Sequence, residues 1–141
     1  VLTPHAGEAT QLLAMLGHPQ TLAETTANPV ESALLIANAT KQLTVLKGNR
    51  TVIAQGTKSY QFDPAPAVLA TAGSGDVLAG IIGALLAGNA ESILSGDAEL
   101  FDVVKAAINL QAQAAALAAK DSTVVALDIA EAVGRVVAAG E

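Results

Sequence analysis

The sequence contains no cysteine and no tryptophan, and aromatic residues make up only 2% of its 141 positions. The absence of cysteine excludes disulfides, thiolate chemistry and zinc–thiolate sites. The only aromatic rings are those of Tyr60, Phe62 and Phe101. A nucleobase or an adenine ring would therefore find few side chains on which to stack.

Charged residues are also scarce, at 14% of the chain, and the net charge is −6. A negative protein repels polyanions, so neither nucleic acid nor an anionic membrane is expected as a partner. No run of apolar residues reaches the roughly 18 that a membrane-spanning helix needs, and no signal peptide is visible. We therefore expect a cytoplasmic protein.

Hydrophobic residues, in contrast, make up 52% of the chain. This content supplies a core and is not that of a disordered chain. The length predicts one domain, covering residues 1–141. Val1 and Leu2 look like the end of a buried strand that runs into Thr3 and Pro4. We therefore expect the chain to begin in the middle of a fold.

Hydrophobic periodicity and turn residues predict helices that alternate with a central group of strands, which is the α/β class. Strands are expected over residues 43–46, 51–54 and 59–62, joined by turns that contain glycine. Leu34, Leu35 and Ala39 are expected to face inward in the helix over residues 30–41. Val133, Val136 and Val137 are expected to face inward in the helix over residues 129–138. Helices are expected over residues 8–16, 30–41, 100–120 and 129–138, with a helical turn in 21–28, Asp128 capping the last helix, and a polar connection over 90–97. A further helix is expected after the turn that ends at Gly75, closed by Gly88 and Asn89.

A turn of small residues, Thr71 to Gly75, runs directly into the apolar helix that follows it. Gly73 and Gly75 permit a positive φ and a close approach by another group. Ser74 is the expected N-cap, which leaves the first backbone N–H groups of the helix pointing outward. A glycine-rich turn that opens a helix binds anions, and phosphate is the usual guest.

Asp76 lies in the first turn of that helix, and two roles are open for it. The helix dipole stabilises a carboxylate there by about 0.3–1 kcal/mol, so Asp76 could serve only as a cap. A carboxylate beside a bound phosphate is repelled, however, unless it has a task such as taking a proton from a nucleophilic hydroxyl. The residue types and their spacing favour neither role.

Three separated motifs resemble one family. They are Thr3-Pro4-His5-Ala6-Gly7-Glu8, the run from Val45 to Ile53 that contains Lys47-Gly48-Asn49-Arg50-Thr51, and Ala72-Gly73-Ser74-Gly75-Asp76-Val77-Leu78-Ala79-Gly80. Together they resemble the C-terminal part of the NAD(P)H-hydrate dehydratases, within the ribokinase-like superfamily. The resemblance implies a ribokinase-like layered sheet with flanking helices, of which the chain would carry only the C-terminal half.

The resemblance also implies a function. Such enzymes use ATP or ADP, with Mg²⁺, to phosphorylate the hydroxyl of hydrated NADH or NADPH, and loss of phosphate restores the dihydronicotinamide. Asp76 matches the residue that contacts the substrate and deprotonates this hydroxyl, and His5 matches a substrate-binding residue. The matching nucleotide-binding residues are Gly73, Ser74 and Gly75, and Lys47, Gly48, Asn49, Arg50 and Thr51; no residue cluster identifies metal ligands.

The chain departs from the family at residues 107–113, where the family usually shows a His-Gly pair, so a role of this helix in the site is in doubt. The connection over residues 90–100 also looks longer than expected. Glu8 is open as a helix cap or a ligand. Lys47 taken alone is a solvated turn residue; its neighbouring motifs favour a phosphate contact.

Two alternatives remain beside the dehydratase. One is a ribokinase-like kinase of a small hydroxylated metabolite, which would share the Asp76 turn. The other is a catalytically silent partial domain that binds nucleotide or assembles with other chains. Because an incomplete sheet would expose an apolar edge, we expect a homo-oligomer or an association with the missing half.

Overall fold

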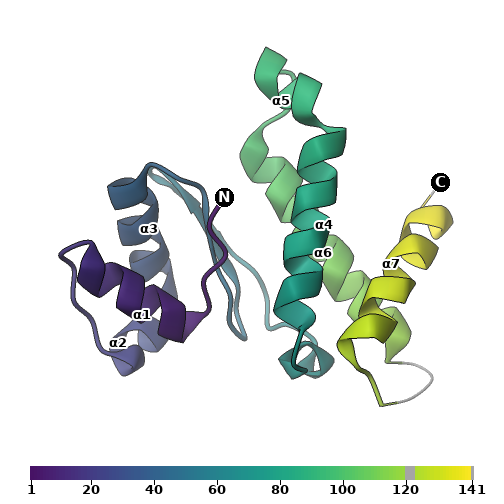
Figure 1. Cartoon of the computed structure of the whole chain (residues 1–141), viewed down its shortest axis with the longest axis horizontal. Coiled ribbons are helices and arrows are strands. Elements are labelled where there is room, and N and C mark those ends of the chain that lie inside the picture. The colour runs from purple at the N-terminus through teal and green to yellow at the C-terminus, as the bar shows by residue number, and fades with distance from the viewer. Residues whose placement is uncertain (120–122, 141) are drawn as a thin grey trace. The chain divides into compact units, whose positions relative to one another are not determined.

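The computed structural model describes residues 1–119 and 123–140, and these form two compact units, Val1–Ala65 and Pro66–Glu141. Figure 1 shows the elements of both units. The first unit mixes strands and helices, and the second is built from helices. The α/β class predicted from the sequence is confirmed. Lys120, the last residue of one expected helix, lies outside the described residues.

The first unit contains a three-stranded antiparallel sheet with the order β1-β2-β3. Its strands are β1 (Thr44–Leu46), β2 (Val52–Gln55) and β3 (Lys58–Gln61), each within one residue of the predicted bounds. Gln55 pairs with Lys58 across a two-residue turn in which Gly56 has a φ of 58°. The left-handed conformation explains why glycine occupies this turn.

The N-terminal segment runs beside β1 without forming a strand of its own. Single parallel bridges pair Leu2 with Thr44 and His5 with Lys47. The Leu2 N–H donates to the Leu43 carbonyl at 2.9 Å, and the Lys47 N–H donates to the Pro4 carbonyl at 2.8 Å. These bonds fix the start of α1 (Ala6–Met15) next to the end of β1.

Helices α1, α2 (Leu22–Ala27) and α3 (Pro29–Thr40) lie on one side of this sheet (Figure 1). The inward face predicted for α3 is confirmed for Leu34 and Leu35, which pack against the core, and is wrong for Ala39. Ala39 is exposed and Leu34 and Leu35 are half-buried, because small side chains allow a closer approach on the neighbouring face. The buried residues of α3 are Ser32, Ala33, Ile36 and Ala37, and they share a core with Ala9, Leu13, Leu46, Val52 and Ala54.

The second unit consists of η1 (Ala67–Ala70), α4 (Ser74–Gly88), α5 (Ala90–Ser95), α6 (Leu100–Ala118) and α7 (Ala126–Ala139). Helix α6 packs against both α4 and α7. Its apolar stripe is rich in alanine, which lets neighbouring backbones come close. The core cluster of this unit comprises Ala114, Ala115, Ala118, Val124, Ile129 and Ala132.

The expected polar connection over residues 90–97 is wrong, because most of it is helix α5. The Ile93 N–H donates to the Asn89 carbonyl at 2.9 Å, and Gly96 ends the helix with a φ of 86°. Leu94 is 88% exposed, so no apolar face of the segment is strongly buried. A helix without a buried stripe leaves no periodic signal in the sequence.

Helix α7 begins earlier than predicted, and Asp128 is its third residue rather than its N-cap. The Val125 N–H donates to the Asp128 carboxylate at 2.8 Å, so Asp128 still caps the helix, from inside it. Ile129 and Ala132 are buried and Val133 and Val136 are half-buried. Val137, predicted to face inward, is 49% exposed.

Over residues 1–119 and 123–140, the structure has no helix with the length and apolar character that crossing a membrane requires.

Candidate substrate and nucleotide site

The turn before α4 differs by one residue from the prediction. Gly73, not Ser74, is the N-cap, and its φ of 86° places it in the left-handed region. Ser74 is the first helical residue, and its hydroxyl donates to the Leu69 carbonyl at 2.7 Å. The expected cap at Ser74 is therefore wrong: its side chain ties the turn back to η1. Left-handed backbone at the cap requires glycine here.

Gly75 lies inside α4, so the positive φ expected for it is also wrong. The Ser74 N–H donates to the Thr71 carbonyl at 3.3 Å, and the Asp76 and Val77 N–H groups both donate to the Gly73 carbonyl, at 3.0 and 3.1 Å. Among the described residues, no acceptor is found for the N–H of Gly75. One outward N–H at a helix start attracts negative charge.

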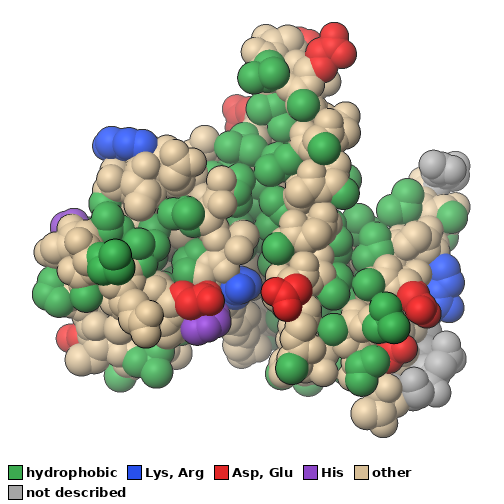
Figure 2. Space-filling view, viewed as in Figure 1, with side chains coloured by type: hydrophobic (Ala, Val, Ile, Leu, Met, Phe, Trp, Pro, Cys, Tyr) green, Lys and Arg blue, Asp and Glu red, His purple; other side chains and the backbone are tan. Residues whose placement is uncertain are grey.

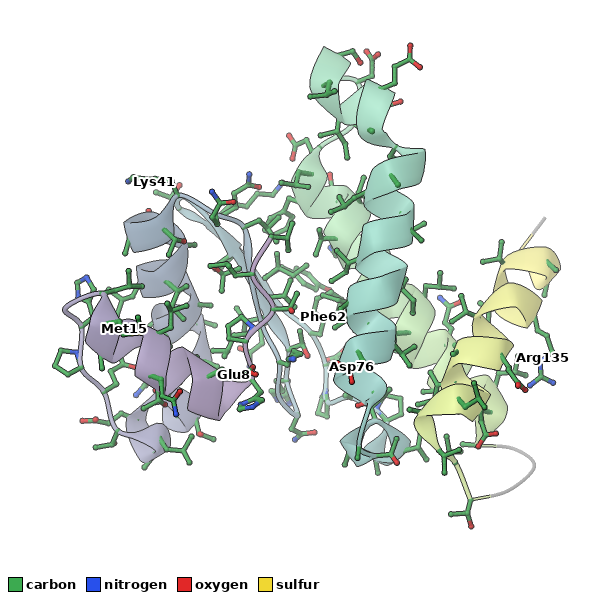
Figure 3. All side chains as sticks on the ribbon, in the orientation of Figure 1. Glu8, Met15, Lys41, Phe62, Asp76 and Arg135 are labelled. Carbon is green, nitrogen blue, oxygen red and sulfur yellow. The ribbon has the colours of Figure 1, made fainter. Side chains whose placement is uncertain are left out.

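Asp76 is the third residue of α4 and lies at the start of that helix (Figure 3). Third-position acids cap three other helices, where Glu8, Glu24 and Asp128 each accept the N–H of the N-cap residue at 2.7–2.8 Å. Across the part of the chain that is described, no hydrogen bond or ion pair of the Asp76 carboxylate is found.

Glu31 and Asp102 are third-position acids that also form no such bond within the described residues, so the position alone does not decide the role. What sets Asp76 apart is its N-cap, the left-handed Gly73, since the N-caps of α3 and α6 both have a negative φ. The N–H of Gly75 beside Asp76 has no acceptor among the described residues, as is usual at the second position of a helix. The helix dipole still stabilises the carboxylate, by about 0.3–1 kcal/mol. Its oxygens, however, are left available to a ligand.

Gln111 on α6 contacts this turn, a role that the sequence pattern did not predict. Its side chain is only 6% exposed, and its amide Nε2–H donates to the Ser74 carbonyl at 2.6 Å. The spacing carries the signal: Gln111 lies four residues after Ala107 and three before Ala114, so all three share one face of the helix, and all three are buried. A polar residue on a buried face needs a partner, and that partner is the turn.

In the first unit, His5 is the N-cap of α1 and forms a reciprocal pair with Glu8. The Glu8 N–H donates to His5 Nδ1 at 3.2 Å, and the His5 backbone N–H donates to the Glu8 carboxylate at 2.7 Å. Nδ1 is thus an acceptor, so the neutral ring carries its proton on Nε2, which lies 3.4 Å from Glu8 Oε1. The imidazole is 61% exposed.

Glu8 therefore serves as a cap, one of the two roles left open for it, and it also approaches a cation. Lys47 Nζ lies 4.0 Å from Glu8 Oε2. Acidic, basic and histidine side chains adjoin at this end of α1 in Figure 2. The hydrogen bond from the His5 N–H lowers the pKa of Glu8, partial desolvation opposes this, and the charges of His5 and Lys47 lower the pKa further.

Lys47 follows the last residue of β1, and the loop after it borders a hollow of about 340 Å³ within the first unit. Lys47, Gly48, Asn49 and Arg50 all line this hollow. Thr51 does not line it; its hydroxyl donates to the Gly48 carbonyl at 3.4 Å. The polar lining residues that the sequence pattern did not predict are Thr25, Thr26 and Gln61.

The comparison with protein families decides the classification. Residues 1–135 match the profile of a carbohydrate-kinase family described as NAD(P)H-hydrate dehydratase. The chain belongs to the NAD(P)H-hydrate dehydratase family. The resemblance predicted from the three sequence motifs is thereby confirmed.

Relatives within the NAD(P)H-hydrate dehydratase family agree. An ADP-dependent (S)-NAD(P)H-hydrate dehydratase of Neisseria meningitidis serogroup B is 43% identical over 88 residues, 62% of this chain and 28% of that protein. A bifunctional NAD(P)H-hydrate repair enzyme of Synechocystis is 34% identical over 132 residues, 91% of this chain and 22% of that protein. The chain thus spans less than a third of these relatives' length.

The fold of the NAD(P)H-hydrate dehydratases extends over nearly the whole chain. The ADP/ATP-dependent NAD(P)H-hydrate dehydratase of Bacillus subtilis, co-crystallized with ATP/Mg²⁺, is 28% identical with a TM-score of 0.79. The match covers 99% of this chain and 47% of that structure. The predicted family fold is confirmed, and the chain spans about half of it.

Proposed function

We propose that this chain contributes to the ADP- or ATP-dependent dehydration of hydrated NADH or NADPH. The observation that carries the proposal is the start of α4, where neither the Asp76 carboxylate nor the Gly75 N–H has a hydrogen-bond partner among the described residues. A general base needs lone pairs that no protein donor occupies, and a transferring phosphoryl group needs preorganised donors. The relatives are ADP- or ATP-dependent NAD(P)H-hydrate dehydratases, and such a reaction could use both groups.

In this reaction Asp76 accepts the proton of the ring hydroxyl while the hydroxyl oxygen attacks the terminal phosphorus of the nucleotide. The bond between that phosphorus and its bridging oxygen breaks, and the shortened nucleotide leaves. The substrate then expels phosphate together with a ring proton, which restores the dihydronicotinamide. Gly73, Ser74 and Gly75 hold the phosphoryl oxygens, mainly through the N–H of Gly75.

Two elements of the first unit complete the proposal. His5 would bind the hydrated substrate by donating its Nε2–H, since its Nδ1 is already used as an acceptor. Residues Lys47 to Thr51 would bind the nucleotide, with the Lys47 ammonium acting as a point charge for phosphate. Four of these five residues line one hollow, which supports a shared ligand.

The described residues contain no group of three or more His, Cys, Asp or Glu side chains suited to a metal ion. They do not define a protein site for Mg²⁺, and no step above depends on one. A magnesium ion that arrives on nucleotide phosphates needs only one or two carboxylates or none.

The proposal is tested by absorbance at the dihydronicotinamide band, with hydrated NADH as substrate and ATP or ADP with Mg²⁺. The assay is run on this chain and on a version extended to the length of the relatives. Recovery of absorbance, abolished by the Asp76→Asn substitution, is the expected result. Nucleotide binding without recovery in either protein would instead favour phosphorylation of a small hydroxylated metabolite.

A further inference from the structure

We infer that Gln111 is a positioning residue that orients the peptide group between Ser74 and Gly75. The inference rests on the proposed function of the Gly73–Asp76 turn. The Gln111 amide on α6 donates to the Ser74 carbonyl at 2.6 Å, a short hydrogen bond. The contact joins residues 37 positions apart in the sequence, so it fixes one helix against another.

Because the peptide group is planar, the bond to the Ser74 carbonyl also affects the N–H of Gly75. The Ser74 carbonyl and the Gly75 N–H belong to one planar amide and point in opposite directions. A donor that holds the carbonyl on one side therefore sets the direction of the N–H on the other side. It also polarises the amide, which strengthens the N–H as a donor. That N–H is the one with no protein acceptor among the described residues.

The Gln111 side chain is buried, which restricts it to the hydrogen bond with Ser74. Gln111 is 6% exposed and lies on the same stripe of α6 as Ala107 and Ala114, which are fully buried. An amide in such surroundings is destabilising unless it is hydrogen-bonded, so its side chain has little freedom to turn away. The Ser74 hydroxyl, bonded to the Leu69 carbonyl at 2.7 Å, fixes the same residue from its other end.

Gln113 offers a matched control, because it has the same side chain on the same helix and is exposed. Amide hydrogen exchange of the full chain compares Gln111→Met with Gln113→Met. In Gln111→Met the Asp76 and Val77 amides should exchange about five to twenty times faster, as expected for one lost hydrogen bond. The amides of α3 should be unchanged, which separates a local loss of order from a global loss of stability.

The functional readout is nucleotide affinity, titrated with ATP and with ADP at a temperature where both variants are folded. We expect about tenfold weaker binding for Gln111→Met, as the loss of one oriented donor predicts, and none of this loss for Gln113→Met. Equal behaviour of the two variants in exchange would overturn the inference. If the unsubstituted protein binds no nucleotide, the proposed function fails while the exchange result still decides the role of Gln111.

A measurement on the unsubstituted protein guards against a variant that does not fold. The Gln111 side-chain amide protons should exchange much more slowly than those of Gln113 in the same spectrum. Equal exchange of the two side chains would show that the bond to Ser74 is not persistent and would overturn the inference.

Discussion

The starts of α1 and α4 carry the same residue type at the same place and end up in opposite states. Each helix has an acid as its third residue, Glu8 in α1 and Asp76 in α4. In α1 the carboxylate accepts the His5 N–H at 2.7 Å, and the cap is closed. In α4 the cap is a left-handed glycine, and no protein donor among the described residues bonds the carboxylate. The two caps differ in backbone conformation, which is extended at His5 and left-handed at Gly73.

The largest effect is expected when the carboxylate of Asp76 is removed. Asp76→Asn keeps the size of the side chain and leaves the fold intact, because the carboxylate has no bond to lose within the described residues. If Asp76 is the general base, turnover in the dehydration assay should fall at least about 10²-fold. The assay uses the extended protein, and circular dichroism checks the fold.

The control for this substitution is Asp102→Asn, since Asp102 is also a third-position acid for which the described residues show no capping bond. It should leave turnover unchanged. A turnover of Asp76→Asn that equals that of Asp102→Asn would reduce Asp76 to a helix-dipole residue.

The next effect concerns the cation beside the closed cap. Lys47→Ala should weaken nucleotide binding by about 10- to 100-fold, as a lost charge-assisted hydrogen bond predicts. Its contact with Glu8, at 4.0 Å, is partly exposed and contributes little to stability. Fluorescence or calorimetric titration with ATP measures the affinity, with Lys41→Gln as the control on the surface of the same unit. Unchanged affinity would return Lys47 to a solvated turn residue.

A smaller effect is expected for a substitution at Gly73, the left-handed N-cap of α4. Gly73→Ala forces a side chain into a φ of 86° and brings its Cβ to 3.1 Å from that of Ala126. The left-handed backbone alone costs about 1–2 kcal/mol of the free energy of unfolding. Gly17→Ala is the matched control, because Gly17 has a φ of 82° and no atom of the described residues lies within 4 Å of the added Cβ.

Urea unfolding of the two glycine variants separates these causes. The decrease in the free energy of unfolding that both variants share measures the cost of placing alanine in a left-handed backbone. Any further decrease in Gly73→Ala measures the close contact with Ala126. If Gly73→Ala were as stable as the unsubstituted chain, the turn would have to adopt another conformation, and the comparison of the two caps would lose its basis.

Local patterns predicted much of this fold, because they depend on neighbours in the sequence. Short apolar or aromatic runs separated by turns that contain glycine predicted all three strands of the first unit, and the apolar segment after the Thr71–Gly75 turn predicted helix α4. The three motifs were sufficient to predict the family, because each keeps its residue types and its order along the chain.

The remaining features depend on contacts or on single dihedral angles. Ser74 and Gly73 are both acceptable caps by residue type, and only the backbone conformation shows that Gly73 is the cap. The role of Gln111 depends on a partner 37 residues away. Helix α5, all of whose residues are described, buries no side chain and so has no periodic signature. The roles of His5, Lys47 and Asp76 in binding and catalysis stay predictions, which the substitutions above address.

The smallest effect concerns the closed cap and its dependence on pH. The His5 N–H bond holds the pKa of Glu8 below its ordinary value in the folded chain, so the unfolded chain binds the proton more readily. Glu8 therefore stabilises the fold above about pH 4.3, and this contribution is lost as the pH falls through the lower, folded-state pKa.

Because the Glu8 side chain is 54% exposed, its contribution to the free energy of unfolding should not exceed about 1 kcal/mol. Thermal unfolding measured from about pH 6 downward through the ordinary pKa of a glutamate should show Glu8→Gln destabilised at the higher pH, with the difference from the unsubstituted chain shrinking as the pH falls. If the stability difference between Glu8→Gln and the unsubstituted chain did not change with pH, the Glu8 carboxylate would not be what closes the cap of α1, and the contrast with α4 would be wrong.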